Sequence, residues 1–172
     1  KQILIPSSVT EIGKFAFYEC KSLEKISFSS STISIGESSF SSCTSLQEIT
    51  LSKKITSISK SVFSSCTSLE SITIPESVTS IGESAFSSCT SLKEIQIPKN
   101  VKSIGNYGFS SCNSLKNVTF YDSLTSIGKY AFFNCTSLQD ITIPQTVNLI
   151  QNNAFDSCST LSSVTYLGKN KN

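Results

Sequence analysis

Hydrophobic residues return along the chain at a fixed interval of 23 residues, and no insertion breaks the count. Three apolar columns keep this step: Phe17, Phe40, Phe63, Phe86, Phe109, Phe132 and Phe155; Leu23, Leu46, Leu69, Leu92, Leu115, Leu138 and Leu161; and Ile12, Ile35, Ile58, Ile81, Ile104, Ile127 and Ile150. Such self-similarity at a short fixed period indicates a repeat architecture.

Each 23-residue unit contains two short extended segments and one tight turn. Ile72 and Ile74 alternate with polar residues, which is typical of a strand with one inward face, and Pro75 ends it because proline cannot donate to a ladder. Residues 78–81 predict a second extended segment, and the glycine column that follows predicts a tight bend. Apolar spacings of three and four in residues 85–89 predict a short helical turn of the 3-10 kind.

A unit this short cannot bury its apolar side alone, so the units must stack and merge their columns into one core. The predicted fold is a right-handed, curved solenoid of about seven turns with parallel strands on one face, roughly 34 Å long at about 4.8 Å per turn. Residues 1–172 form one domain. We expect it to belong to a longer repeat array, because the chain opens inside a strand without a polar cap.

Composition removes several classes of function. The chain has no His, Trp, Met or Arg, and its net charge is only +2, which argues against a nucleic-acid partner. No run approaches the roughly 18 apolar residues of a membrane span, so this segment is not expected to insert into a bilayer. Without histidine, a paired-carboxylate cleft or a glycine-rich phosphate loop, we expect no enzyme activity and no cofactor.

Cysteine forms a fourth regular column: Cys20, Cys43, Cys66, Cys89, Cys112, Cys135 and Cys158. Parallel thiols one turn apart do not converge on a tetrahedral metal site, and no histidine is present as a further ligand or as a base. Their Cβ vectors point the same way and their number is odd, which argues against disulfides. We therefore predict a core ladder of seven free, buried thiols that fill space.

The stretch SVTSIGESAFSSCTSL, residues 77–92, resembles the BspA-like, or treponemal, class of leucine-rich repeats, and the resemblance extends over residues 1–172. It implies a leucine-rich repeat solenoid and a role in adhesion. The partners it implies are host cell-surface or matrix proteins, including fibronectin and fibrinogen. It also implies a secreted or surface-displayed protein, although free thiols are equally compatible with the cytoplasm.

A binding surface must differ from turn to turn, so the irregular positions on the strand side are the candidates. They form a candidate protein-binding face: Lys25, Glu48, Glu70, Lys93, Glu94, Gln96, Lys116 and Asp140. The charges are mixed in sign, and the usual hot-spot residues Trp and Arg are missing. We expect modest affinity per turn, with strength gained along the length of the solenoid or by avidity.

Exposed aromatic residues are expected on the other side of the repeat. Phe15, Tyr107 and Tyr130 share one column, and Tyr18 and Phe133 share a neighbouring one. Either these are scattered surface aromatics, or Tyr107, Tyr130 and Phe133 form a local contact patch.

Three further expectations depend on the same repeats. Two glycosylation sequons begin at Asn117 and Asn134, and a glycan on Asn117 would obstruct the strand face. The open edge of the solenoid could support self-association. The function favoured overall is a non-enzymatic binding module; the alternative is a structural spacer whose uniform repeats only set a length.

Overall fold

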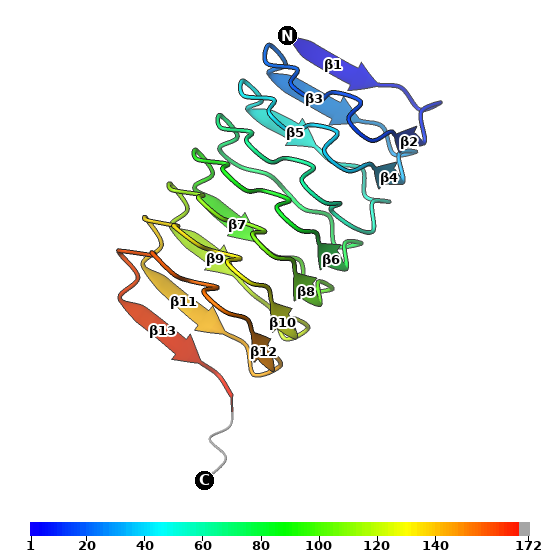
Figure 1. The fold of residues 1–172 in the computed structure, drawn as a ribbon. Coiled ribbons are helices and arrows are strands. Elements are labelled where there is room, and N and C mark those ends of the chain that lie inside the picture. Colours follow the sequence, from blue (N-terminus) through cyan, green and yellow to red (C-terminus); the bar gives the residue numbers. More distant parts are fainter. Residues whose placement is uncertain (169–172) are drawn as a thin grey trace.

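The computed structural model describes residues 1–168 as a stack of similar turns, with two rows of short parallel strands (Figure 1). The first row contains β1 (Gln2–Ile5), β3 (Lys25–Phe28), β5 (Glu48–Thr50), β7 (Glu94–Gln96), β9 (Asn117–Thr119), β11 (Asp140–Ile143) and β13 (Ser163–Tyr166). The second row contains β2 (Glu11–Ile12), β4 (Ser34–Ile35), β6 (Ser80–Ile81), β8 (Ser103–Ile104), β10 (Ser126–Ile127) and β12 (Leu149–Ile150). The outward side of the first row is called the strand face below.

Strand pairing follows the repeat period throughout. Every pairing is parallel and joins residues 23 positions apart, such as Gln2 with Lys25 and Asp140 with Ser163. The first row consists of three sheets, β1-β3-β5, β7-β9 and β11-β13, and the second row of two, β2-β4 and β12-β10-β8-β6. The predicted parallel solenoid of about seven turns is confirmed.

The predicted apolar columns form one continuous core. The phenylalanine column stacks from Phe17 to Phe155 with ring centroids 5.1 to 5.9 Å apart, and its five inner rings are fully buried. The isoleucine of each second-row strand points inward, except in the last turn, where Ile150 is exposed. The two end turns are less buried because each has a neighbouring turn on one side only. None of the described residues forms a helix able to cross a membrane.

The prediction of a short helical turn is wrong. In each repeat the segment between the second-row strand and the cysteine, residues 14–20 in the first turn, consists of consecutive tight turns that we call the turn edge. Phe15 and Glu19 have φ values of 59° and 56°, in the left-handed region, and the same two positions are left-handed in every repeat. The N–H groups of Phe15 and Phe17 donate to the carbonyl oxygens of Glu37 and Ser39 in the next turn, at 3.1 and 2.8 Å. A helix would keep these donors within its own segment.

The glycine column is explained by close packing between turns and not by a bend in the left-handed region, since no glycine has a positive φ. A Cβ built on Gly105 would lie 2.6 Å from the backbone of the preceding turn, and Gly36, Gly82 and Gly128 are equally confined. Ser59 replaces glycine in the third turn. There the serine hydroxyl donates to the Ile35 carbonyl at 2.6 Å, and the second row of strands is interrupted between β4 and Ile58.

The cysteine column also has a bonding role that the sequence did not reveal. The thiol of Cys89 donates to the Phe63 carbonyl in the preceding turn at 3.1 Å, and the thiols of Cys43, Cys66, Cys112, Cys135 and Cys158 repeat this contact at 3.1 to 3.2 Å. All seven thiols are free. The five inner ones are buried as predicted, whereas Cys20 and Cys158, in the end turns, are only partly buried.

Burial keeps the inner thiols neutral. It raises the pKa of Cys43 to about 11 and that of Cys112 to about 12, and it raises the pKa values of Cys66 and Cys89 well above their ordinary range. A thiolate is the reactive form of cysteine, so these residues are unreactive in the folded protein. The ladder is therefore structural.

The glycine contact predicts a position-dependent cost. Gly105→Ala should lower the free energy of unfolding by about 1–3 kcal/mol, because its methyl group would be forced against backbone atoms. Gly13→Ala is the matched control, since nothing lies within 4 Å of its Cβ. Urea unfolding of both variants measures the difference, and equal costs at the two positions would contradict the close-approach explanation.

Thiol exposure predicts selective labelling. A thiol reagent added to the native protein should modify Cys20 and Cys158 first and leave the five inner cysteines unmodified. After denaturation all seven should react. Mass spectrometry of digested protein identifies the sites, and native labelling of Cys66 or Cys89 at the rate of Cys20 would rule out the buried ladder.

The raised thiol pKa values predict a loss of stability in alkali. The unfolded Cys112 thiol titrates near its ordinary pKa of 9.0 while the folded one stays protonated up to about 12. Above pH 9 the unfolded state therefore binds fewer protons, and stability falls by at most about 1.4 kcal/mol per pH unit for each such thiol. Urea unfolding under reducing conditions between pH 8 and 11 measures the slope. It should be shallower in Cys112→Ala, and an unchanged slope would count against the mechanism.

Candidate functional site

The strand side holds all eight residues of the predicted protein-binding face. Lys25, Glu48, Glu94 and Asp140 begin strands β3, β5, β7 and β11, and Gln96 ends β7. The remaining three, Glu70, Lys93 and Lys116, lie just before the positions where strands begin and form one border of the face. Lys25 is partly buried and the other seven are exposed, so the structure brings the predicted residues to one surface.

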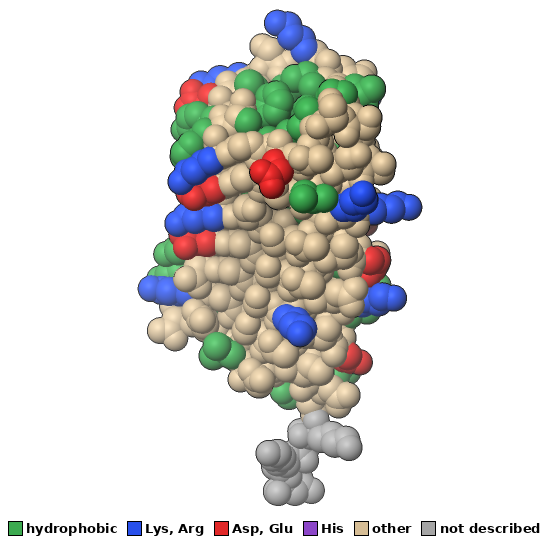
Figure 2. All heavy atoms as spheres, turned by 90° about the vertical axis from the view of Figure 1, so that its right-hand side faces the viewer, with side chains coloured by type: hydrophobic (Ala, Val, Ile, Leu, Met, Phe, Trp, Pro, Cys, Tyr) green, Lys and Arg blue, Asp and Glu red, His purple; other side chains and the backbone are tan. Residues whose placement is uncertain are grey.

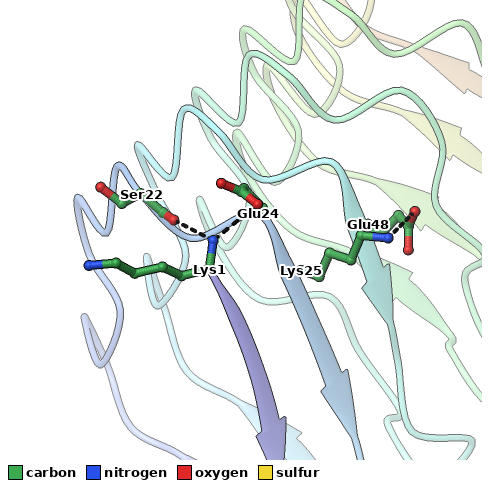
Figure 3. A network of polar contacts seen from close by, with 5 residues as sticks. All are labelled: Lys1, Ser22, Glu24, Lys25 and Glu48. Atoms are coloured by element: carbon green, nitrogen blue, oxygen red, sulfur yellow. Dashed lines mark hydrogen bonds and ion pairs between the residues drawn. The ribbon is translucent and has the colours of Figure 1, made fainter.

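Four of the seven charged residues of this face neutralise one another in pairs. Lys25 Nζ lies 2.8 Å from Glu48 Oε1 (Figure 3), and Lys93 Nζ lies 2.6 Å from Glu70 Oε2. Each pair joins equivalent positions of adjacent turns. These side chains are mostly exposed, so each pair contributes less than about 1 kcal/mol to stability. Within residues 1–168, Glu94, Lys116 and Asp140 have no ion-pair partner.

The α-amino nitrogen of Lys1 lies 3.1 Å from both the Ser22 carbonyl oxygen and Glu24 Oε2. Figure 3 draws both contacts. On the other side of the turns, Lys14 pairs with Glu37 at 2.9 Å and Lys60 with Glu83 at 3.0 Å. Figure 2 shows lysines next to acidic side chains along one edge of the molecule, beside a broad surface with few charges. Pairing one period apart is therefore the rule on both sides.

A hollow of about 990 Å³ lies on the strand face, where the first row is interrupted. Within residues 1–168, residues 71–74 contact β5 through a single bridge between Thr50 and Thr73, and no strand pairing joins them to β7. The polar lining consists of Thr50, Lys53, Ser71, Thr73, Glu76, Ser77, Glu94, Gln96, Asn117 and Thr119. Of the predicted face, only Glu94 and Gln96 belong to this hollow.

Sequence reasoning missed the hollow because nothing in the local sequence marks it. Residues 71–74 read SITI and fail to form a regular strand, whereas β11 (Asp140–Ile143) reads DITI and forms one. The lining can donate and accept hydrogen bonds and presents charges of both signs. Among residues 1–168 no three His, Cys, Asp or Glu residues are grouped in a way that could hold a metal ion.

The predicted aromatic patch is one connected cluster on the turn edge. The rings of Tyr107 and Tyr130 stack with centroids 5.2 Å apart, and Phe133 meets Tyr130 edge-on at 5.5 Å. Lys129 Nζ lies 5.2 Å from the Tyr130 centroid. These four residues are called the C-terminal aromatic cluster, and their rings lie in contact with one another, as a local patch at these positions requires.

A second cluster in the first turn repeats this geometry. Phe15 and Tyr18 meet edge-on at 5.6 Å with an interplanar angle of 86°, close to the 88° between Tyr130 and Phe133. Lys14 Nζ lies 5.1 Å from the Phe15 centroid. Lys14, Phe15 and Tyr18 are called the N-terminal aromatic cluster. Its sequence signal was available, since KFAFY and KYAFF occupy the same positions in turns one and six.

The two sequons differ in accessibility. Asn117 begins β9 and is exposed on the strand face, where it belongs to the lining of the hollow. Asn134 is partly buried, has a φ of 57°, and its amide donates to the Ser111 hydroxyl at 3.5 Å. Asn117 is therefore the better placed of the two for a modification.

Comparison with known proteins gives a consistent relationship. The family model described as a BspA type leucine rich repeat region matches in six copies, over residues 1–106 and 79–172. A leucine-rich repeat protein from Bacteroides ovatus is 32% identical with a TM-score of 0.91, over 95% of this chain and 45% of that one. The leucine rich repeat protein of T. pallidum is 30% identical with a TM-score of 0.83, over 94% of this chain and 78% of that one.

The chain thus spans less than half of the Bacteroides protein. Among curated proteins none matches the sequence. Because the family model covers the solenoid from its first turn to its last, the chain belongs to the BspA-type leucine-rich repeat family.

Proposed function

We propose that the chain is a non-enzymatic protein-binding module, and that it binds its partner through the strand face around the hollow. The observation that carries this proposal is the hollow itself, a depression of about 990 Å³ on a surface that is otherwise formed by regular strands. Concave surfaces with convergent polar groups are where proteins commonly bind ligands.

The chemistry around the hollow is suited to hydrogen bonding with a polar protein surface. Thr73, Gln96 and Thr119 point outward across it, and Glu94 adds a charge that has no ion-pair partner in the described part of the chain. Glu70 and Lys93 neutralise each other at its border and contribute little attraction. Because the chain also lacks histidine, the lining offers binding groups and no nucleophile paired with a base.

The partner class and location follow from the family resemblance. Adhesion to host cell-surface or matrix proteins is the role it implies, with fibronectin and fibrinogen as the named matrix candidates, and the module would be displayed at the cell surface or secreted. With no Trp or Arg to anchor the contact, affinity should be modest for one segment and greater for a longer array of turns.

A structural spacer is the second candidate. The observation that favours it is the pairing of Lys25 with Glu48 and of Lys93 with Glu70, since charges that satisfy one another within the chain are less available to a partner. In that case the turns would only set a length, and neither matrix protein would bind.

The test places the same substitution inside and outside the hollow. Thr73→Lys fills the hollow with a long charged side chain, and Thr56→Lys changes an equally exposed threonine outside it. Binding of each variant to immobilised fibronectin and fibrinogen is measured by surface plasmon resonance.

Thr73→Lys should weaken binding by about tenfold or more, while Thr56→Lys should bind as the parent does. Absence of binding by the parent chain at micromolar concentration would support the spacer. Equal losses in the two variants would show that the strand face is not the contact surface.

A further inference from the structure

The two aromatic clusters have the same arrangement of side chains, which therefore occurs twice on the turn edge. Each has a lysine ammonium 5.1 or 5.2 Å from the ring centroid of an aromatic residue whose backbone is in the left-handed conformation. A second ring meets the first edge-on. Phe15 and Tyr130 are five repeats apart, which corresponds to about 24 Å along the stack at about 4.8 Å per turn. Tyr107 extends the second cluster by one more ring.

The scaffold itself does not require these rings. In turns two to four the Phe15 column holds Ser38, Ser61 and Ser84, with φ values of 53° or 54°, and the fold of the turn edge is unchanged. The left-handed conformation costs roughly 1 kcal/mol for any residue with a Cβ, so the serines and the aromatic residues of this column bear it alike. What distinguishes the aromatic residues is their exposed apolar surface, since 50% of Phe15 and 39% of Tyr107 remain accessible to solvent. Exposed aromatic side chains that the fold does not require are candidates for binding.

The size of each cluster fits a small ligand better than a protein surface. A stable protein interface covers about 800 Å² on each partner and uses some 20 to 30 residues. Each cluster has two or three rings, and the turns between them have partly exposed serines at the same positions, such as Ser61 and Ser64. The turn edge therefore offers two separate small contact points and no continuous apolar surface.

The groups around the rings fit a sugar. One face of Tyr107 covers Tyr130, and its other face is directed toward the preceding turn, where the same column holds the small Ser84. The face of an aromatic ring is electronegative, and the C–H face of a pyranose ring carries the complementary partial charge.

Hydroxyl groups at the rim of a sugar need donors and acceptors, and both clusters have them nearby. Asp156 lies next to the C-terminal cluster, since its carbonyl accepts the Asn134 N–H at 2.9 Å and its carboxylate accepts from the Asn153 amide at 3.1 Å. Glu19 and Lys21 flank the N-terminal cluster, and Lys21 Nζ lies 3.4 Å from Glu19 Oε2.

From the duplicated geometry we infer that the turn edge binds a neutral linear glycan, with one sugar stacked at each cluster and the chain lying along the solenoid axis. Contact at two points links the two binding events, so a long glycan should bind more tightly than a short one that reaches a single cluster. This site is on a different side of the repeat from the strand face and is independent of the protein-binding proposal.

Because the chain has no tryptophan, its intrinsic fluorescence comes mainly from tyrosine. Three of the five tyrosines, Tyr18, Tyr107 and Tyr130, belong to the clusters. The probes are cellohexaose, chitohexaose and maltohexaose, each compared with its disaccharide. Binding is followed by tyrosine fluorescence in the parent chain and by calorimetry in all variants. At least one hexasaccharide should bind about tenfold more tightly than its disaccharide.

The variants use the residue that the scaffold itself has at these positions. Phe15→Ser with Tyr18→Ser removes the N-terminal cluster, and Tyr107→Ser with Tyr130→Ser removes the stacked rings of the C-terminal one. Either double variant should unfold cooperatively and lose about tenfold in hexasaccharide affinity, while its disaccharide affinity stays the same. Tyr121→Ser, on the strand side, is the matched control and should bind as the parent does.

Three results would overturn the inference. The first is the absence of saturable binding of all three hexasaccharides at millimolar concentration. The second is a hexasaccharide affinity that survives removal of either cluster. The third is loss of fibronectin or fibrinogen binding, without any glycan binding, in the cluster variants, which would make the rings a protein contact.

Discussion

Every turn of this protein must form backbone hydrogen bonds with its neighbours at an offset close to one repeat, and the other regular features depend on that constraint. On the turn edge the N–H groups of one turn donate to the carbonyl groups of the next, as Phe17 donates to Ser39 and Phe40 to Val62. Backbones this close leave no room for a Cβ at Gly105 or Gly128. Glycine therefore fits this distance best. At Ser59 the strand pairing is locally lost, whereas in the last turn β12 stays paired with β10 although Gln151 occupies the glycine position.

The same offset organises the core. Identical side chains are placed directly above one another, so the phenylalanine rings stack and each cysteine reaches a carbonyl of the preceding turn. The S–H contact explains why a small residue with a weak donor recurs at that position. A purely apolar residue would fill the space but leave the carbonyl without this second donor.

Side chains outside these columns are free to vary, and they divide into two surfaces with different chemistry. On the strand face, charges one period apart form Lys–Glu pairs, and the hollow around Thr73 is the site proposed for a protein partner. On the turn edge, one left-handed position of each repeat is a serine in turns two to four. In other turns the same position is occupied by Phe15, Tyr107 or Tyr130. A partner protein on one surface and a glycan on the other could be bound together without competition.

The sequence by itself determined the period, the parallel stacking and the identity of the core columns. These follow from repetition, because a residue repeated at every turn meets its own copies whatever the local backbone is. The tertiary structure alone decided that the turn edge forms left-handed turns instead of a short helix, because the competing acceptors for its N–H groups belong to the next turn. It also decided which charges pair, where the strand face is hollow, and that KFAFY and KYAFF build the same cluster, because each depends on side-chain geometry between turns that spacing does not specify.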